Sequence, residues 1–138
     1  EIAKTLTGSM TVTPADENDK WYYKLTSVTT TSADLIAGRF LDYTAVDQDT
    51  DQTAVSTSDK VKFLFIQNTS SSDGIYICLD GDTAANDLVD GIFIGPSQTF
   101  VGRFPNTTVG NIHAISSDIG DTGDASATAI VCALIDDV

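Results

Sequence analysis

The sequence predicts an all-β fold, namely an antiparallel β-sandwich of about eight or nine strands with a jelly-roll-like arrangement. In residues 60–138, short apolar runs alternate with turn signals such as Asp73-Gly74, Asp80-Gly81 and Asp90-Gly91. No segment has convincing helical spacing. Because that many strands in one open sheet would leave an apolar face in water, we expect two packed sheets.

The chain has the length of one domain, 138 residues, and a domain of this size buries about two thirds of the surface of its unfolded chain. Hydrophobic residues make up 41% and charged residues 20%, a balance typical of a globular protein. No apolar run is long enough to cross a bilayer. We therefore expect a single β-sandwich domain over residues 1–138 with no membrane partner.

Residues 1–13 are predicted to form an N-terminal docking arm or an edge strand. Their β-prone alternation is broken by Gly8 and ends at a polar turn, residues 14–19. The apolar residues of this arm are Ile2, Leu6, Met10 and Val12.

The next three segments are predicted from composition. Residues 21–31 combine aromatic and β-branched side chains, which suit a strand. Residues 34–46 approximate helical spacing, but Gly38 and the threonine-rich flanks favour a strand, which we expect. Residues 47–59 are polar and acidic and should form an exposed loop.

The strongest hairpin signal joins residues 60–67 to residues 75–80 through a polar turn. Strict alternation would place Val61, Phe63 and Phe65 on one face of the first strand and Lys62, Leu64 and Ile66 on the other. Further strands are predicted at residues 92–94, 98–103 and 111–116.

The last predicted strand, residues 126–135, is apolar on both faces. Such a strand either lies at the centre of a sheet or contributes one face to a subunit interface. The face made of small residues would permit close approach, so we predict it as the interface. Its residues are Ala127, Ala129, Val131, Ala133 and Ile135.

Charge excludes nucleic acid as a partner. The chain has 20 acidic and 7 basic residues and a formal net charge of −13. Phosphate contacts require clustered lysine and arginine, and the cations here are scattered. Three associated copies, each with −13, would carry −39, so an interface between copies must be mostly apolar.

No catalytic arrangement is predicted. His113 is the only histidine, and no nucleophile motif accompanies it, so we expect a structural role and no enzyme activity. Cys78 and Cys132 lie in apolar strand runs; buried unpaired thiols are expected, with a disulfide between neighbouring strands as the alternative. A zinc site is not expected from one histidine and two distant cysteines.

The acidic residues raise the question of calcium. Asp47, Asp49 and Asp51 have the spacing that begins a calcium loop, but Gln52 replaces the turn glycine and no glutamate closes the loop. Asp80-Gly81-Asp82 and the acids Asp118, Asp121 and Asp124 of the glycine-rich loop are equally loose candidates. We therefore expect solvated loops, and no cofactor.

Two surface features have ordinary explanations. Trp21 and Tyr23 could form a platform for stacking on sugars, with Tyr22 on the opposite face, but core packing is the simpler role. Asn68 and Asn106 each begin a glycosylation-type triplet, which a chain rich in serine and threonine contains by chance.

Several strings of the chain resemble small virion structural proteins of tailed bacteriophages, particularly those of marine bacteria. The strings are Trp21-Tyr22-Tyr23-Lys24, Thr30-Thr31-Ser32-Ala33-Asp34-Leu35-Ile36, Asp59-Lys60-Val61-Lys62-Phe63-Leu64-Phe65-Ile66-Gln67-Asn68, Gly74-Ile75-Tyr76 and Ile112-His113-Ala114-Ile115-Ser116. The resemblance covers about two thirds of the chain in pattern and contains no active-site signature.

The resemblance implies a decoration or cement protein on the outer surface of a capsid, in contact with the major capsid protein. It also implies a homotrimer, because capsid decoration usually occupies three-fold positions. The arm would dock onto the shell by adding a strand to a neighbour. The alternative is a host-recognition module, a tail-fibre or head-fibre tip that binds surface glycan through loops such as residues 47–59 or 120–124.

Overall fold

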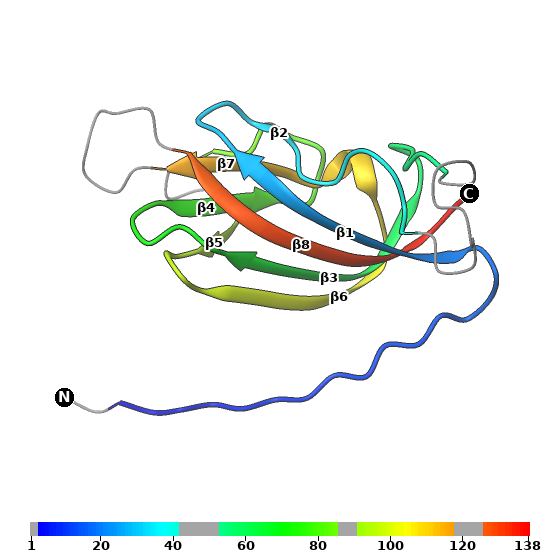
Figure 1. Ribbon diagram of the computed structural model, residues 1–138, viewed down its shortest axis with the longest axis horizontal. Coiled ribbons are helices and arrows are strands. Elements are labelled where there is room, and N and C mark those ends of the chain that lie inside the picture. Colours follow the sequence, from blue (N-terminus) through cyan, green and yellow to red (C-terminus); the bar gives the residue numbers. More distant parts are fainter. Residues whose placement is uncertain (1–2, 42–52, 86–90, 118–125) are drawn as a thin grey trace.

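Eight strands and one short 3-10 helix make up the regular structure of the computed structural model, which describes residues 3–41, 53–85, 91–117 and 126–138 (Figure 1). The strands are β1 (Asp19–Val28), β2 (Ala33–Asp34), β3 (Lys60–Asn68), β4 (Gly74–Cys78), β5 (Ile92–Ile94), β6 (Thr99–Thr108), β7 (His113–Ser117) and β8 (Ala127–Asp136). The helix η1 spans Val109–Asn111. Among the described residues, no helix is long and apolar enough to cross a membrane.

The strands form two antiparallel sheets of four. Sheet A has the order β1-β8-β3-β6, and sheet B has the order β2-β7-β4-β5. The first strand pairs with the last, the second with the seventh, the third with the sixth and the fourth with the fifth. This nested pairing is that of a jelly roll, so the predicted all-β sandwich is confirmed.

The core lies between the two sheets and consists mainly of aliphatic side chains. Sheet A contributes Tyr22, Leu64, Ile66 and Val131, among others, and sheet B contributes Ile75, Ile77 and Ile94. Asn68, at the end of β3, is fully buried, and its side-chain amide donates to the carbonyl oxygens of Asp73 (2.8 Å), Gly95 (3.1 Å) and Ile94 (3.2 Å). Buried polar groups need such partners, and here they join the end of β3 to the opposite sheet.

The predicted hairpin of residues 60–67 and 75–80 is wrong. Both segments are strands, but β3 pairs with β6 and β8 in sheet A, whereas β4 pairs with β5 and β7 in sheet B. The polar segment between them therefore crosses from one sheet to the other. Sequence signals for turns do not distinguish these two connections.

The predicted facing of β3 is also corrected. A register shift between Val61 and Phe63 interrupts the alternation of side chains. Val61 is consequently buried on the same side as Leu64 and Ile66, while Phe63 and Phe65 lie on the outer face. A β-bulge has this effect because one extra residue in the strand moves the side chains before the bulge to the opposite side of the sheet from the one that strict alternation predicts.

The predicted strand at residues 34–46 is reduced to the two residues of β2. Leu35, Ile36 and Phe40 are buried without regular pairing. Backbone hydrogen bonds hold this segment in place: the N–H of Leu35 donates to the carbonyl oxygen of Ile112 (3.0 Å), and that of Leu41 donates to the carbonyl oxygen of Trp21 (2.8 Å). Residues 42–46 lie outside the described residues.

Candidate protein-interaction site

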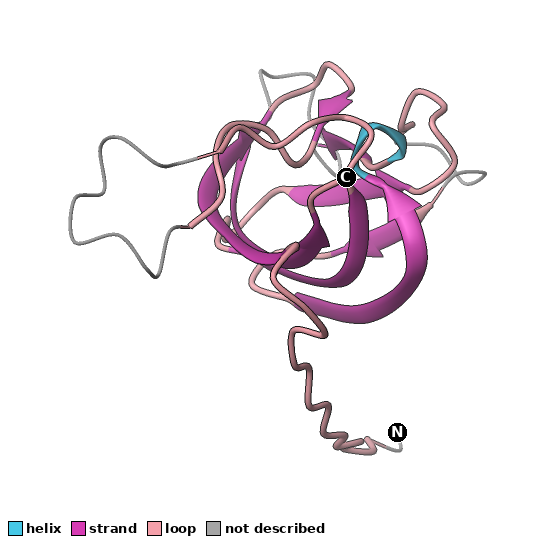
Figure 2. Cartoon of the chain, turned by 90° about the vertical axis from the view of Figure 1, so that its right-hand side faces the viewer, coloured by secondary structure: helices cyan, strands magenta, loops and turns pink. Residues whose placement is uncertain are grey.

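The N-terminal arm projects from the sandwich without joining either sheet (Figures 1 and 2). Residues 3–18 contain no strand, and Leu6 is 81% and Met10 45% exposed, although both are apolar. Val12 is partly buried, and Ile2 lies outside the described residues. An extended segment that exposes such side chains in its own chain has its apolar surface available to another protein.

The arm has one apolar side and one hydroxyl side when it is extended. The even-numbered positions from 4 to 12 are Lys4, Leu6, Gly8, Met10 and Val12. The odd-numbered positions from 5 to 13 hold only threonine and serine. Successive side chains of a strand point to opposite faces, so this is the pattern of a strand with one face against protein and one in water.

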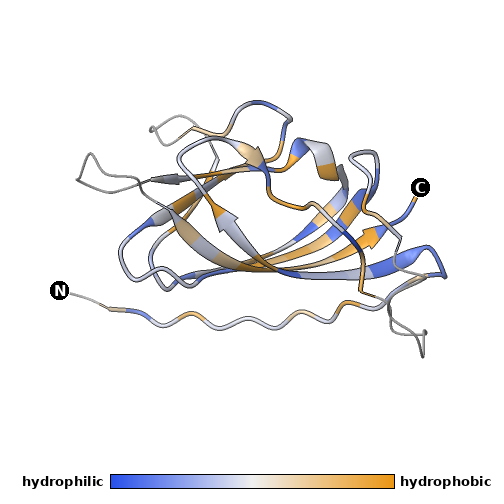
Figure 3. Cartoon of the chain, turned by 45° about the horizontal axis from the view of Figure 1, so that its top comes forward, coloured by the Kyte–Doolittle hydropathy of each residue, from blue (hydrophilic) through white to orange (hydrophobic). Residues whose placement is uncertain are grey.

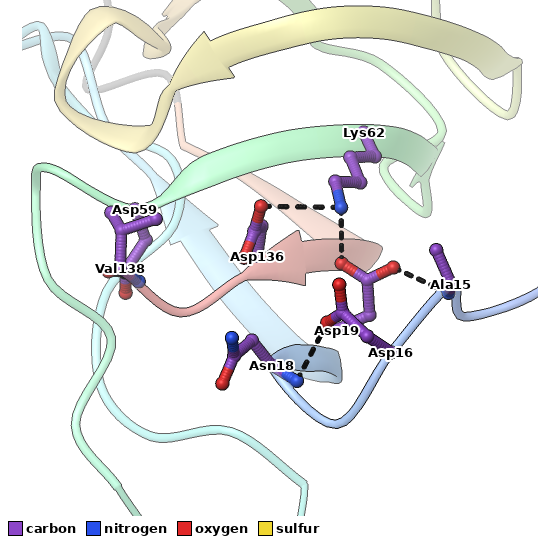
Figure 4. Close-up of polar contacts among 8 residues, drawn as sticks. All are labelled: Ala15, Asp16, Asn18, Asp19, Asp59, Lys62, Asp136 and Val138. Atoms are coloured by element: carbon purple, nitrogen blue, oxygen red, sulfur yellow. Dashed lines mark hydrogen bonds and ion pairs between the residues drawn. The ribbon is translucent and has the colours of Figure 1, made fainter.

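A polar cluster fixes the point at which the arm joins β1 (Figure 4). The carboxylate of Asp19 accepts a hydrogen bond from the backbone N–H of Ala15 at 2.7 Å. The ammonium of Lys62 lies 2.6 Å from Asp19 and 3.3 Å from Asp136. Asn18 adds a turn by donating its N–H to Asp16 at 2.9 Å. The arm therefore leaves the body in a set direction.

Hydrogen bonding decides the charge state of this cluster. Burial alone would raise the pKa of Asp19, but the hydrogen bonds from Lys62 and Ala15 outweigh it and hold the pKa below its ordinary value of 3.8. The same hydrogen bond to Asp19 raises the pKa of Lys62 above its ordinary value of 10.5. Both groups are therefore charged at neutral pH.

Three carboxylates of this cluster, those of Asp16, Asp19 and Asp136, lie within 4.8 Å of one another, a spacing that a metal ion could bridge. The ammonium of Lys62 already binds two of them. A lysine in that place supplies the positive charge that a cation would otherwise bring. We assign no metal to the cluster.

The outer face of sheet A is largely apolar, and we call it the outer apolar face. Three cross-strand rows form it, and each row contains one residue from each of the four strands. The rows are Trp21-Leu134-Phe63-Arg103, Tyr23-Cys132-Phe65-Val101 and Leu25-Ile130-Gln67-Thr99. Leu25 is 62% exposed, Tyr23 52% and Val101 45%. The other apolar residues of the face are partly buried, except Leu134, which is 1% exposed. Exposed apolar side chains that gather on one face of a sheet are typical of a protein-interaction surface.

The charged strand residues within and beside this face, on the outer side of sheet A, nearly balance, in contrast to the chain as a whole. They comprise the acids Asp19 and Asp136 and the bases Lys60, Lys62 and Arg103. The net charge of the whole chain is −13. The excess acids therefore lie elsewhere, and a partner that approaches this face meets little repulsion.

The predicted interface on β8 is wrong. Its five residues are 0–1% exposed because they face sheet B and form part of the chain's own core, so they cannot contact a second copy. They are Ala127, Ala129, Val131, Ala133 and Ile135. The other explanation of this strand holds, because β8 lies between β1 and β3 at the centre of sheet A.

The residues missed by the sequence reasoning are on the opposite side of the same strands. Tyr23 and Leu25 were visible as an alternating apolar pair in the first predicted strand. Their exposure could not be read from the sequence, because both sides of that sheet are apolar and the composition does not say which one faces the second sheet.

The predicted calcium candidates Asp47, Asp49 and Asp51 lie outside the described residues, as does Asp118. Asp80 accepts a hydrogen bond from the N–H of Asp82 at 3.2 Å, which is the geometry of a local polar turn.

His113 has a structural setting. It lies opposite Asp34 on the paired strands β7 and β2, and its Nε2 is 3.2 Å from Asp34 Oδ1 and 3.1 Å from the carbonyl oxygen of Gly110. Its Nδ1 is 3.5 Å from the hydroxyl of Ser32, at the limit of hydrogen bonding. That hydroxyl accepts a hydrogen bond from the N–H of Ala84 at 2.9 Å. These contacts tie the short strand β2 to its neighbour.

A pocket beside β2 is lined by Asp34 and by Val28, Leu35 and Ala114 among others, but by neither Ser32 nor His113. A serine nucleophile also requires donors for the developing oxyanion within reach. The absence of enzyme activity stays a prediction.

The two cysteines are not bonded to each other. Cys78 is buried in sheet B, where its thiol donates to the carbonyl oxygen of Asp82 at 3.0 Å. Cys132 is partly buried on the outer apolar face, where burial raises the pKa of its thiol. A raised pKa keeps the reactive thiolate scarce at neutral pH, so Cys132 behaves as an apolar residue.

The structure of the chain is similar to that of the coat protein of tobacco streak virus. The TM-score is 0.46 and the sequence identity is 13%, with 89% of each chain covered. No model of a known protein family matches the chain, and no curated protein does. A fold does not by itself define a function.

Proposed function

We propose that this protein is a structural component of a virus particle, a decoration or cement protein on the outer surface of a tailed-bacteriophage capsid. It acts through protein-protein contacts with the major capsid protein and with further copies of itself, and it catalyses no reaction. The outer apolar face is the observation that carries the proposal. Exposing apolar surface to water is unfavourable in free energy, and binding of a partner removes that cost by burying the surface.

The sequence resemblance supports this role and supplies the phage context and the homotrimer. The charge distribution also supports it. A body with a net charge of −13 is repelled by packaged DNA, which favours the outside of a shell over its interior. The outer apolar face, where charges nearly balance, is then the surface that meets the shell.

The arm supplies a second contact in this proposal. Its exposed apolar residues, Leu6 and Met10, can be buried if the arm adds a strand to a neighbouring protein in the particle. An arm gives reach, because about 3.3 Å of length per residue lets eleven residues span about 36 Å. A cement protein needs such reach to bridge neighbouring subunits.

The test is binding of the purified protein to capsids assembled without it. We expect saturable binding of hundreds of copies per particle. Val101→Glu, which places a charge in the middle row of the outer apolar face, should lower the affinity at least tenfold. Phe93→Glu is the matched control, because Phe93 is equally exposed, at 45%, but lies on sheet B. Absence of binding, or a handful of copies per particle, would refute the proposal.

A second candidate function is glycan recognition by a fibre tip. Trp21 and Tyr23 both lie on the outer apolar face, and an exposed aromatic ring can stack on a sugar. Trp21 packs edge-to-face on Phe63 at 6.2 Å, which leaves Tyr23 as the more accessible ring. Binding to a glycan array that Tyr23→Ser abolishes would favour this function over decoration.

A further inference from the structure

Strand β6 has an unpaired edge. On one side it pairs with β3 from Lys60 to Gln67, and on the other side it has no neighbouring strand among the described residues. The opposite edge of sheet A differs, because the carbonyl oxygen of Trp21 in β1 accepts a hydrogen bond from the N–H of Leu41. The edge strands of sheet B contain only two and three residues. Of the ten residues of β6, Thr99–Phe104 precede Pro105, which has no N–H, and Asn106, whose φ is +63°. An exposed edge such as that of Thr99–Phe104 invites another strand.

The core is incompletely covered beside this edge. Phe100 and Phe104 point inward from β6 but remain partly exposed, with their ring centroids 6.4 Å apart. Gly102 lies between them and adds no side chain. A strand laid along β6 with apolar residues on its inner side would cover both rings.

The N-terminal arm has the properties that this edge requires. Residues 3–13 are extended, and no hydrogen bond from their backbone to the body is present in the described structure. The apolar side of the arm contains Leu6, Met10 and Val12, and the opposite side contains hydroxyls. Residues 3–13 include one base, Lys4, and no acid, so an acidic body attracts the arm.

Within one chain the arm does not pair with β6 in the described structure. The arm begins at β1, and β6 is the opposite edge strand of the same sheet. The three strand spacings between these edges, about 14 Å, are within the reach of the arm, so its direction of exit, and not its length, separates the two. The cluster around Asp19 fixes the exit of the arm, which runs clear of the sheets in three views (Figures 1, 2 and 3). A donor and an acceptor that do not meet in one chain can meet between two.

We propose that residues 3–13 of one copy add as a strand to the edge of β6 in a second copy, with Leu6, Met10 and Val12 packed over Phe100 and Phe104. Each copy both donates an arm and receives one. This contact is head-to-tail, so it generates a closed ring when the rotation between copies permits. The inference deepens the proposed role of the arm by naming its acceptor, and it can be tested in the absence of any capsid.

The experiment measures molar mass in solution by size-exclusion chromatography with light scattering. We expect the full chain to give a discrete multiple of 14.6 kDa, and three times that value for the trimer proposed above. The chain without residues 1–13 should be a folded monomer, because no backbone hydrogen bond joins the described part of this segment, residues 3–13, to the sandwich. The full chain with Gly102→Glu, which places a charge between Phe100 and Phe104, should also be a monomer.

Mixing these two monomers provides the decisive measurement. The truncated chain has no arm but keeps an intact β6 edge, whereas the Gly102→Glu chain keeps its arm but has an altered β6 edge. The arm of the second chain can therefore pair with the β6 edge of the first, and a 1:1 complex should form. A synthetic peptide of residues 1–13 should bind the truncated chain and slow hydrogen exchange at the backbone amides of β6. The same peptide with N-methylated alternate residues should not bind, because it cannot pair as a strand.

Two matched controls separate this contact from others. Leu6→Asp with Met10→Asp should abolish the oligomer, whereas Thr7→Asp with Thr11→Asp adds the same charge to the hydroxyl side and should not. Val101→Glu lies on the outer face of β6 and should leave the oligomer intact while it weakens capsid binding.

Three results would overturn the inference: an oligomer that persists without residues 1–13, a full chain that is monomeric at high concentration, or a mixture that forms no complex. If the oligomer forms as expected but capsids are not bound, the proposed function fails and the arm contact stands. The converse result, capsid binding by a monomer, removes only the arm contact.

Discussion

The ammonium nitrogen of Lys62 lies 2.6 Å from a carboxylate oxygen of Asp19, and this pair joins the bulged strand β3 to the first residue of β1 (Figure 4). The side chain of Asp19 is 1% exposed and that of Lys62 is 23% exposed. The pair lies where the arm leaves the sandwich. One interaction therefore stabilises the fold and orients the segment that we propose to bind other proteins.

Replacing Asp19 by asparagine should destabilise the chain by about 1–3 kcal/mol, because a buried charged hydrogen-bond acceptor is lost while Lys62 keeps Asp136 as a partner. Urea unfolding at pH 7, followed by tryptophan fluorescence, measures the change. Asp137→Asn is the control: it removes the surface ion pair with Lys20 and should cost less than about 1 kcal/mol. Equal effects of the two substitutions would contradict the importance assigned to Asp19.

The same pair predicts a pH dependence of stability. The pKa of Asp19 is lowered on folding, so its contribution is fully present above pH 3.8 and is lost as the pH falls through the folded pKa. The pKa of Lys62 is raised, so its contribution is present below pH 10.5 and is lost as the pH rises through the folded pKa. As the pH falls below 3.8, the free energy of unfolding should therefore decrease by a smaller amount in Asp19→Asn than in the natural chain.

The comparison with the variant is necessary because acid has a second effect. Protonation of the many surface carboxylates reduces the net charge of −13 and with it the repulsion within the folded chain. That effect is common to both proteins and cancels in the difference between them. An unchanged pH dependence in the variant would show that Asp19 does not titrate as described.

The fold class was predictable because strand periodicity and turn residues are local. The segments of β3, β5 and β8 were located within a residue or two of their observed bounds. The pairing of β3 was not predictable, since a polar segment such as residues 69–73 can close a hairpin or cross between sheets. The bulge after Val61 was equally invisible, because nothing in the local composition marks an extra residue.

The proposed interaction surface was predictable only in part. The arm was identified from its alternation and the polar turn that follows it, and in the structure its residues Leu6 and Met10 are exposed. The face of β8 was assigned to the wrong side, because Ala133 and Cys132 on its two sides are both apolar. The side of β8 that faces the second sheet is set by the pairing of strands that are far apart in the sequence.

The buried side chain of Asn68 offers a third prediction. Its amide donates to three carbonyl oxygens: that of Asp73, just before β4, that of Ile94 in β5, and that of Gly95, just after β5. Its side-chain oxygen accepts a hydrogen bond from the N–H of Ser70 at 3.0 Å. Asn68→Ala should cost about 2–4 kcal/mol, because several buried groups lose their partners together. Chemical denaturation measures the loss.

Asn68 should also remain unmodified in the folded protein, although it begins a glycosylation-type triplet, because its side chain is buried. Asn106 begins the other triplet and is exposed, which makes it the matched control. If the chain is expressed in a glycosylating host, mass spectrometry of peptides containing each residue distinguishes the two. Glycan at Asn68 in folded protein would contradict the burial described here.

Gly91 provides the sharpest test of backbone geometry. Its φ of +82° belongs to the left-handed region, and a Cβ atom there would lie 1.9 Å from the carbonyl oxygen of Ile77 in the neighbouring strand β4. Gly91→Ala should therefore destabilise the chain by at least about 2 kcal/mol, from both the backbone conformation and the displacement of β5 from β4. Gly8→Ala in the arm is the control, since no atom lies within 4 Å of the added Cβ and the melting temperature should not change. A common response of the two variants in thermal unfolding would show that β5 does not pair with β4 as described.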